Sequence, residues 1–174
     1  HLRVYGDVGQ VTPLQVTLGD ARNIDAACKG SHAVINLLGI LYEKGSSTFE
    51  AVHVKAIEDI AKACTKHSIS RLIHISALGA KLKSESHYAR TKALGEQKGQ
   101  AAFTEMTIIR PGLIFGAGDD FFNRFAGLAK IAPLLTLFDK GETKLQPVYV
   151  GDVAQSIMAV LADSTTKGKL YELG

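Results

Sequence analysis

Apolar stretches of strand length alternate along this chain with segments whose apolar positions recur at helical spacing. The runs 33–40, 71–76 and 106–115 are nearly continuous in apolar residues, which is typical of strands covered on both faces. A segment of helical period separates each run from the next. This alternation predicts an α/β protein with a doubly wound parallel sheet, in which helical crossovers connect the strands.

Local signals place the ends of several elements. We expect a short strand at 14–18, followed by a brief helix that Asp20 caps. The stretch 47–50 matches a capping box, Ser-x-x-Glu, and predicts the start of a long amphipathic helix. A serine, either Ser84 or Ser86, is expected to cap the helix that follows the run 71–76.

The alternation loosens beyond residue 116. Helices are expected at 119–132 and 152–161, and short strands at 135–138, 144–149 and 168–173. We therefore divide the chain into a strand–helix part, residues 1–116, and a smaller part, residues 117–174, that packs on it on the substrate side.

Tyr88 and Lys92 carry the first chemistry that the sequence suggests. They are four residues apart in an expected helix, so their side chains share one face, one turn apart. A nearby ammonium favours the phenolate and draws the pKa of a tyrosine, about 10, toward neutrality. A phenol prepared in this way can exchange a proton with a carbinol or a carbonyl. The spacing alone is weak evidence, because an exposed helix pair gives the same pattern.

Three of the expected strands end beside small or polar residues. Gly39, Ser76 and the pair 111–112 (Pro-Gly) follow or interrupt the three apolar runs. Ligands bind at the carboxyl ends of the strands in open parallel sheets. We therefore expect these strand ends and the helix with Tyr88 to line a single crevice.

A glycine-rich phosphate loop between a first strand and a first helix is missing from this pattern. The glycines within 6–9 precede an expected strand, and those within 116–118 are followed by Asp119 and Asp120. Two carboxylates would occupy the positive helix end that a pyrophosphate needs. We therefore expect the first βαβ unit to lie outside this chain and the parent protein to be longer at both ends.

Composition narrows the functional classes further. The 174 residues carry a net charge of +3 with both signs interspersed, and no basic helix or aromatic platform points to nucleic acid. No apolar run approaches the roughly 20 residues of a membrane span. Cys28 and Cys64 are expected to be small core residues in a reducing compartment. The histidines form no ligand cluster, so we predict no metal site.

Seven segments together carry a resemblance to a known family: Val8–Val11, Val34–Gly39, His74–Ala80, Tyr88–Lys92, Ile109–Gly116, Phe121–Phe125 and Gln146–Ala154. They resemble the extended and atypical short-chain dehydrogenase/reductase superfamily, whose members include NAD-dependent epimerase/dehydratase-like proteins with a Rossmann-like fold. Within it, the chain is similar to the Rossmann-type accessory subunit of respiratory complex I and its bacterial relatives.

The resemblance implies a nicotinamide nucleotide site and assigns residues to it. It places Asp20 at the adenine, although a plain helix N-cap explains Asp20 as well. Lys92 would bind the nicotinamide ribose and Tyr88 would be the acid/base, with Ser76 the third member of the catalytic group. The implied cofactor-binding residues are Asp20, Leu38, Gly39, Ile40, Ser76, Tyr88, Lys92, Pro111, Gly112 and Ile114.

Two departures from the pattern of the superfamily bear on activity. The catalytic Ser or Thr of active members falls at Ala77, so a hydroxyl that polarises the substrate carbonyl is missing. Loss of one such donor lowers rates by roughly 10²–10³-fold at comparable sites. Where extended members carry Asn on the preceding helix, this chain has His53, which lies on the apolar stripe and is expected to be a satisfied core histidine.

The resemblance therefore favours an NAD(P)H-binding accessory or assembly subunit of respiratory complex I with little or no turnover. The alternatives are an active NAD(P)-dependent epimerase, dehydratase or reductase that uses Tyr88, and a nucleotide-sensing regulator. The cofactor is expected to be NADP or NAD, with a slight preference for NADPH. The implied location is the bacterial cytoplasm, or the matrix side of the mitochondrial inner membrane with peripheral membrane contact as an option.

Overall fold

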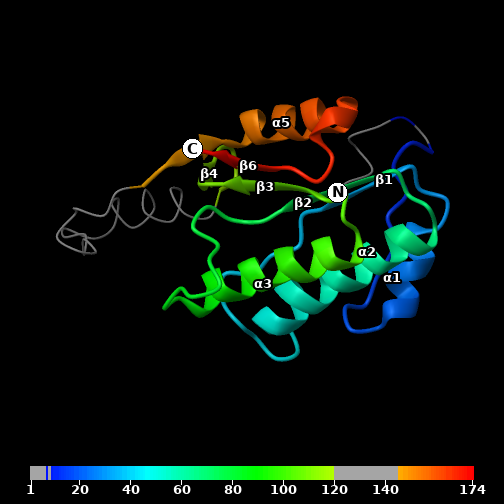
Figure 1. Cartoon of the computed structure of the whole chain (residues 1–174), viewed down its shortest axis with the longest axis horizontal. Helices are drawn as coiled ribbons and strands as arrows, with labels where there is room; N and C mark the ends of the chain where they lie inside the picture. Colours follow the sequence, from blue (N-terminus) through cyan, green and yellow to red (C-terminus); the bar gives the residue numbers. More distant parts are fainter. Residues whose placement is uncertain (1–6, 8, 120–144) are drawn as a thin grey trace.

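The computed structural model describes residue 7 and residues 9–119 and 145–174, and it shows three layers with a parallel sheet in the middle (Figure 1). The sheet contains four strands in the order β1-β2-β3-β6, and every neighbouring pair is parallel. The strands are β1 (Ala33–Asn36), β2 (Arg71–Ile75), β3 (Thr107–Pro111) and β6 (Leu170–Leu173). The predicted doubly wound parallel sheet is confirmed.

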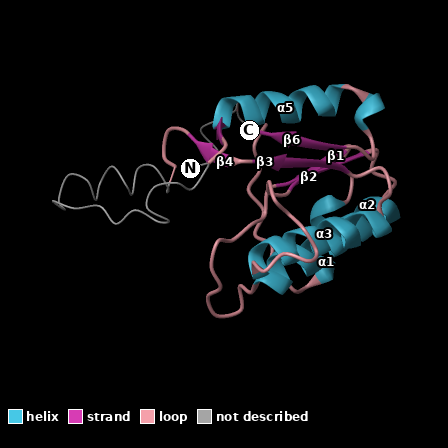
Figure 2. Ribbon diagram, turned by 60° about the vertical axis from the view of Figure 1, so that its left-hand side comes forward, coloured by secondary structure: helices cyan, strands magenta, loops and turns pink. Residues whose placement is uncertain are grey.

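Helices cover both faces of the sheet (Figure 2). The helices on one face are α1 (Ala21–Cys28), the π-helical turn η2 (Glu50–Lys55) that runs into α2 (Ala56–Lys66), and α3 (His87–Ala102). The other face carries α5 (Val150–Ala162), drawn in orange above the sheet in Figure 1. A short 3-10 helix, η4 (Ser164–Thr166), follows α5, and β4 (Leu113–Phe115) pairs with β5 (Pro147–Tyr149) beyond the end of β3.

Each helical layer encloses its own apolar cluster. The larger cluster lies between the sheet and α1 and α2, where Ile57, Leu72 and Ile108 are fully buried or nearly so. The smaller one joins Ile73 and Ile109 to α5. Successive residues of a strand point to opposite faces, so Leu72 and Ile73 serve different clusters. This requirement explains why the runs 71–76 and 106–115 are continuous in apolar residues.

The predicted helix starts were partly right. Asp20 caps α1 by accepting the N–H of Arg22 at 3.0 Å, and Ser86, one of the two candidates, caps α3. The capping box at 47–50 is wrong by one residue, because Thr48 is the cap and its hydroxyl accepts the N–H of Ala51. The acidic partner is Glu43, which accepts the N–H of Phe49 at 2.6 Å after the chain folds back on itself.

The strand predicted at 14–18 is not formed. Its apolar side chains, including Leu14 at 67% exposure, lie in solvent, and no strand of the described residues pairs with it. Coverage of the first run on both faces is also wrong, since Ile35 in β1 is 39% exposed. The helix predicted at 119–132 and the strand at 135–138 fall almost entirely outside the described residues.

Residues beyond 116 contribute to the main sheet. Strand β6 pairs with β3 from Ile108↔Leu170 to Pro111↔Leu173, and α5 packs Val160 on the sheet. Arg71 of β2 reinforces this layer by donating to the hydroxyl of Thr166 at 2.8 Å. The division of the chain at residue 116 stays a prediction, but elements from both parts share one sheet.

Helix α3 packs very closely on η2 and α2 because glycines face the contact. A Cβ at Gly95 would lie 1.9 Å from the carbonyl oxygen of His53, which belongs to the backbone and cannot move aside. A Cβ at Gly99 would lie 2.8 Å from Met106 Cε, the flexible end of a side chain. The two positions therefore differ in what a methyl group would displace.

We expect Gly95→Ala to destabilise the fold by about 2 kcal/mol or more, because overpacking against backbone forces the helices apart. Gly99→Ala is the matched control, since Met106 can repack and alanine gains about 1 kcal/mol of helix propensity over glycine. Urea unfolding of both variants gives the measurement. Equal midpoints for the two variants would contradict this account of the close helix contact.

Candidate functional site

A pocket of about 370 Å³ opens at the carboxyl ends of β1, β2 and β3, as the topology of the sheet predicts. Its size lies in the ~300–1,000 Å³ range of small-molecule sites. Of the predicted cofactor residues, those that line it are Leu38, Gly39, Ile40, Ser76, Tyr88, Lys92, Pro111, Gly112 and Ile114. The strand ends and the start of α3 therefore meet in one crevice, as expected from the sequence.

The sequence did not single out several further wall residues. These are Leu37, Leu41, Ile75 and Leu113, and all are neighbours of predicted ones. The signal that could have found them is the rule that the whole carboxyl edge of a parallel sheet faces the ligand site. All four are apolar, so the wall of the pocket is mainly hydrophobic with a few polar groups.

Asp20 is the one predicted site residue that does not line this pocket. It stands at the N-terminus of α1, where its carboxylate forms an ion pair with Arg22 at 3.0 Å. Hydrogen bonds from Arg22 lower the pKa of Asp20. The structure thus accounts for Asp20 as a helix cap, while the adenine contact stays a prediction.

Lys92 is the main charged group of the pocket. It is only 4% exposed, and its ammonium donates to the carbonyl oxygen of Ile75 at 3.2 Å. The same nitrogen lies 3.4 Å from the place that a Cβ of Gly39 would occupy, so the backbone at Gly39 runs directly beside the ammonium. Burial lowers the pKa of Lys92 to about 8. The pocket therefore holds a positive charge at neutral pH that titrates within the mildly alkaline range.

Tyr88 does not have the lowered pKa that the sequence predicted. Burial raises the pKa of its phenol, and no contribution from Lys92 offsets that effect. The reason is geometric: the ammonium of Lys92 is turned to the strand end, while the Tyr88 ring packs edge-on against His53 with centroids 5.2 Å apart. In this arrangement Tyr88 is a protonated hydrogen-bond donor.

Ser76 and Ala77 occupy the end of β2 beside the pocket. Ser76 is 5% exposed, and its hydroxyl has no hydrogen-bond partner among the described residues. Ala77, half-buried, presents a methyl group where active members of the superfamily that the sequence resembles carry a hydroxyl. The arrangement can bind a ligand with hydroxyl or anionic groups near Lys92, but it offers one donor fewer for polarising a carbonyl.

His53 is a buried core residue, as predicted from its place on the apolar stripe. Its ring is 1% exposed, stacks on Phe49 at 5.1 Å, and reaches the backbone of Ile40 and the hydroxyl of Thr91. Burial, assisted by the charge of Lys92, lowers the pKa of His53 to about 4. The imidazole is therefore neutral at physiological pH.

A glycine turn at 116–118 was predicted to be closed by acidic residues. The N–H of Gly116 donates to the carboxylate of Asp119 at 3.4 Å. A carboxylate thus lies on the backbone amide that a phosphate would need at this turn.

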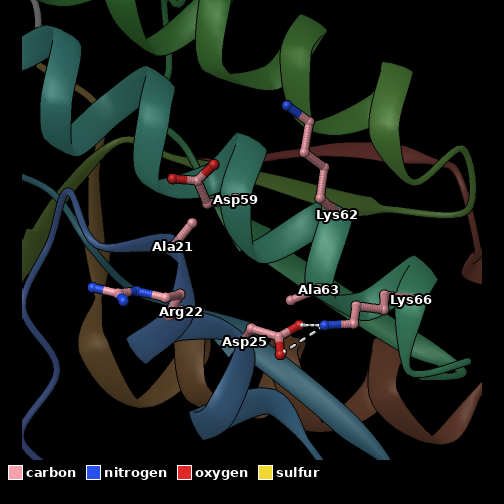
Figure 3. Close-up of a pocket in the computed structure, with 7 residues that line it drawn as sticks. All are labelled: Ala21, Arg22, Asp25, Asp59, Lys62, Ala63 and Lys66. Atoms are coloured by element: carbon pink, nitrogen blue, oxygen red, sulfur yellow. Dashed lines mark hydrogen bonds and ion pairs between the residues drawn. The ribbon is translucent and has the colours of Figure 1, made fainter.

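A second hollow, of about 300 Å³, lies between α1 and α2 (Figure 3). Its charged side chains already have ion-pair partners, such as Asp25 with Lys66 at 2.9 Å and Lys62 with Glu58 at 2.6 Å. His67 also binds Asp25, at 3.0 Å. The contacts of Asp25 fasten α1 to α2, so we assign this hollow a structural role.

No helix of the described residues is long and apolar enough to span a bilayer.

Two known proteins are similar in sequence to this chain over nearly its whole length. NADH dehydrogenase [ubiquinone] 1 alpha subcomplex subunit 9, mitochondrial, from Arabidopsis thaliana is 39% identical over 100% of this chain and 44% of its own length. The mouse (Mus musculus) protein of the same name is 40% identical over 98% of this chain and 45% of its length. The chain thus spans less than half the length of these relatives.

A solved structure shows the same fold. The dTDP-glucose 4,6-dehydratase DesIV from Streptomyces venezuelae, with NAD bound, superposes with a TM-score of 0.80 at 18% identity, over 99% of this chain and 61% of that one. The sequence profile of a family described as NAD(P)H-binding matches residues 1–164. The chain therefore belongs to this NAD(P)H-binding family.

Proposed function

We propose that this chain is the nucleotide-binding part of an accessory or assembly subunit of respiratory complex I, with little or no turnover of its own. The identities of 39–40% to the alpha subcomplex subunit 9 proteins support this assignment. Because the chain spans only part of those proteins, its partners in the complex are inferred from them. The cofactor is NADP or NAD, with NADPH slightly preferred.

One observation carries the nucleotide site: every predicted cofactor residue except Asp20 lines a single pocket at the strand ends. The pocket combines apolar walls, which suit the flat nicotinamide ring, with the buried cation Lys92, which suits ribose hydroxyls and the neighbouring phosphate. The backbone at Gly39 runs beside this ammonium, since a Cβ there would lie 3.4 Å from Lys92 Nζ.

Two features support binding without turnover. Ala77 cannot donate a hydrogen bond to a substrate carbonyl, and the pKa of Tyr88 is raised by burial, which makes the phenol a weaker acid.

An active NAD(P)-dependent epimerase, dehydratase or reductase is the second candidate, because Tyr88 and Lys92 both line the pocket. A nucleotide-sensing regulator would share the site and lack the chemistry. The proposed location is the matrix side of the mitochondrial inner membrane, or the cytoplasm in a bacterium.

We expect Lys92→Met to weaken NADPH binding by about 10–100-fold, because a charge-assisted hydrogen bond contributes roughly 1.5–3 kcal/mol. Lys98→Met, an exposed position on the same helix, is the matched control and should leave the affinity unchanged. Fluorescence titration of the full-length protein with NADPH measures both. Equal affinities for the two variants would remove Lys92 from the site.

The affinity for NADPH should also fall as the pH rises above 8. The lowered pKa of Lys92, about 8, means that the ammonium is mostly charged at pH 7 and mostly neutral at pH 9. If the charged form binds, the apparent dissociation constant rises about tenfold between these two values. The Lys92→Met variant should show no such rise. A wild-type affinity that stays constant from pH 7 to pH 9 would contradict the role of the ammonium.

The accessory role predicts association without turnover. We expect the full-length protein to co-purify with respiratory-chain subunits and to oxidise no NADPH when offered a panel of ketones, aldehydes and nucleotide sugars. Tyr88→Phe should leave the co-purification intact. Carbonyl-dependent NADPH oxidation that disappears in Tyr88→Phe would instead establish the second candidate, an active reductase.

A further inference from the structure

The wall of the pocket after β1 is held from behind by buried polar side chains. Asn36, the last residue of β1, is 3% exposed and accepts the N–H of Leu38 at 3.1 Å through its Oδ1. The other end of the same amide, Nδ2, lies 3.0 Å from Nδ1 of His74. The register of the sheet makes this possible, because Asn36 and His74 are direct partners across β1 and β2. One buried pair therefore fixes the backbone of Leu38.

These contacts assign the tautomer of His74. Since the Oδ1 of Asn36 is occupied by Leu38, the group that faces His74 is the amide NH₂, which can only donate. Nδ1 of His74 must then accept, and the ring proton resides on Nε2. The ring is 1% exposed, and its Nε2 has no partner among the described residues.

His53 holds the other side of the same wall. Its Nδ1 lies 3.1 Å from the hydroxyl of Thr91, and that hydroxyl donates to the carbonyl of Tyr88 at 3.0 Å. Nε2 of His53 faces both backbone groups of Ile40, the N–H at 3.2 Å and the carbonyl oxygen at 3.1 Å. The ring therefore binds the backbone of Ile40 in either tautomer: its Nε2 accepts the N–H when Nδ1 carries the proton, and donates to the carbonyl oxygen when Nε2 carries it.

The residue between these two anchored amides is Gly39, which faces the ammonium of Lys92. Lys92 Nζ would lie 3.4 Å from a Cβ at that position and is held at the end of β2 by the carbonyl of Ile75. A shift of the 38–40 backbone toward Lys92 would therefore fill the space beside the ammonium, and a shift away from Lys92 would remove the backbone from beside it.

We propose that His53 and His74 are positioning residues of the pocket: together they hold the backbone of Leu38 and of Ile40 on either side of Gly39, and so set the place of Lys92. This inference rests on the proposed nucleotide site for its consequence, but the clamp itself is a property of the protein without ligand. The two imidazoles make no contact with the pocket and act through the backbone and Asn36.

The clamp needs a neutral His74, since a protonated ring donates at both nitrogens and cannot accept from the side-chain amide of Asn36. Burial and the charge of Lys92 lower the pKa of His53 to about 4 and that of His74 to about 3. The charged or titratable groups that influence His53 are Lys92, Glu43 and His87, and those that influence His74 are Lys92 and His53. The clamp should persist from pH 8 down to about pH 5.

The first test uses the full-length protein without nucleotide. Long-range ¹H–¹⁵N spectra of the imidazoles should show both rings neutral and the proton of His74 on Nε2, with no titration between pH 8 and pH 5. A proton on Nδ1 of His74, or a midpoint near pH 6.5 for either ring, would overturn the clamp. This measurement needs no variant and no ligand, so it also decides the matter if the variants fail to fold.

The second test removes the anchors one at a time. In His53→Leu the amide of Ile40 should exchange with deuterium about fivefold faster, and in His74→Leu the amide of Leu38 should do so, since a lost hydrogen bond contributes about 1 kcal/mol. His53→Gln, whose amide oxygen can accept from Ile40, should restore much of the protection. His67→Gln, outside the pocket wall, is the control. Unchanged exchange at both amides in folded variants would refute the proposal.

The consequence for the site is a loss of NADPH affinity of about tenfold in each leucine variant, partly rescued in His53→Gln. If the amides are released and the affinity does not change, the positioning role is wrong while the nucleotide site stands. If the unaltered protein binds neither NADPH nor NADH, the proposed function fails, and the tautomers and amide exchange still decide whether the clamp exists.

Discussion

The burial of one ammonium, that of Lys92, is the constraint on which the rest of the pocket depends. A cation that is 4% exposed needs oxygen atoms close by, and the end of β2 supplies the carbonyl of Ile75. The backbone at Gly39 lies on its other side, where a Cβ would be 3.4 Å from Lys92 Nζ. These contacts do not fully replace the water that the ammonium loses on burial, and the pKa of Lys92 is therefore lowered to about 8. The folded protein thus holds a charge that an anionic or hydroxyl-rich ligand would stabilise.

That same charge explains the state of the groups around it. Two histidines lie within its influence, and both have a pKa far below the ordinary 6.5 because burial and Lys92 act in the same direction. Neutral imidazoles can accept hydrogen bonds, so they can hold the backbone of the pocket wall in place through such bonds. A second cation in place of either ring would repel Lys92 in a region of low dielectric. The polar network is therefore arranged so that only one of its members is charged.

The sequence predicted what periodicity and topology determine. Continuous apolar runs predicted β1, β2 and β3. For β2 and β3 the reason is that alternate residues of each strand pack against the helices on opposite faces of the sheet. The rule that ligands bind at the carboxyl ends of parallel strands then placed Gly39, Ser76 and Gly112 together. The contact between Asn36 and His74 could not be predicted from the sequence, because it depends on strand register, which no local pattern specifies. The raised pKa of Tyr88 was missed for a similar reason: spacing on a helix says that Lys92 is a neighbour, but not that its side chain turns to Ile75.

The geometry separates holding a ligand from reacting with it. The groups that would hold a nucleotide, namely the Lys92 ammonium and the backbone at Gly39, are buried and anchored from behind. The groups that would react are weakened, because Ala77 offers no hydroxyl and the phenol of Tyr88 stays protonated at neutral pH. Catalysis requires donors that bind the transition state better than the ground state, whereas a structural cofactor needs only ground-state contacts. A subunit whose nucleotide stabilises the fold within a larger assembly has a use for the first set of groups and none for the second.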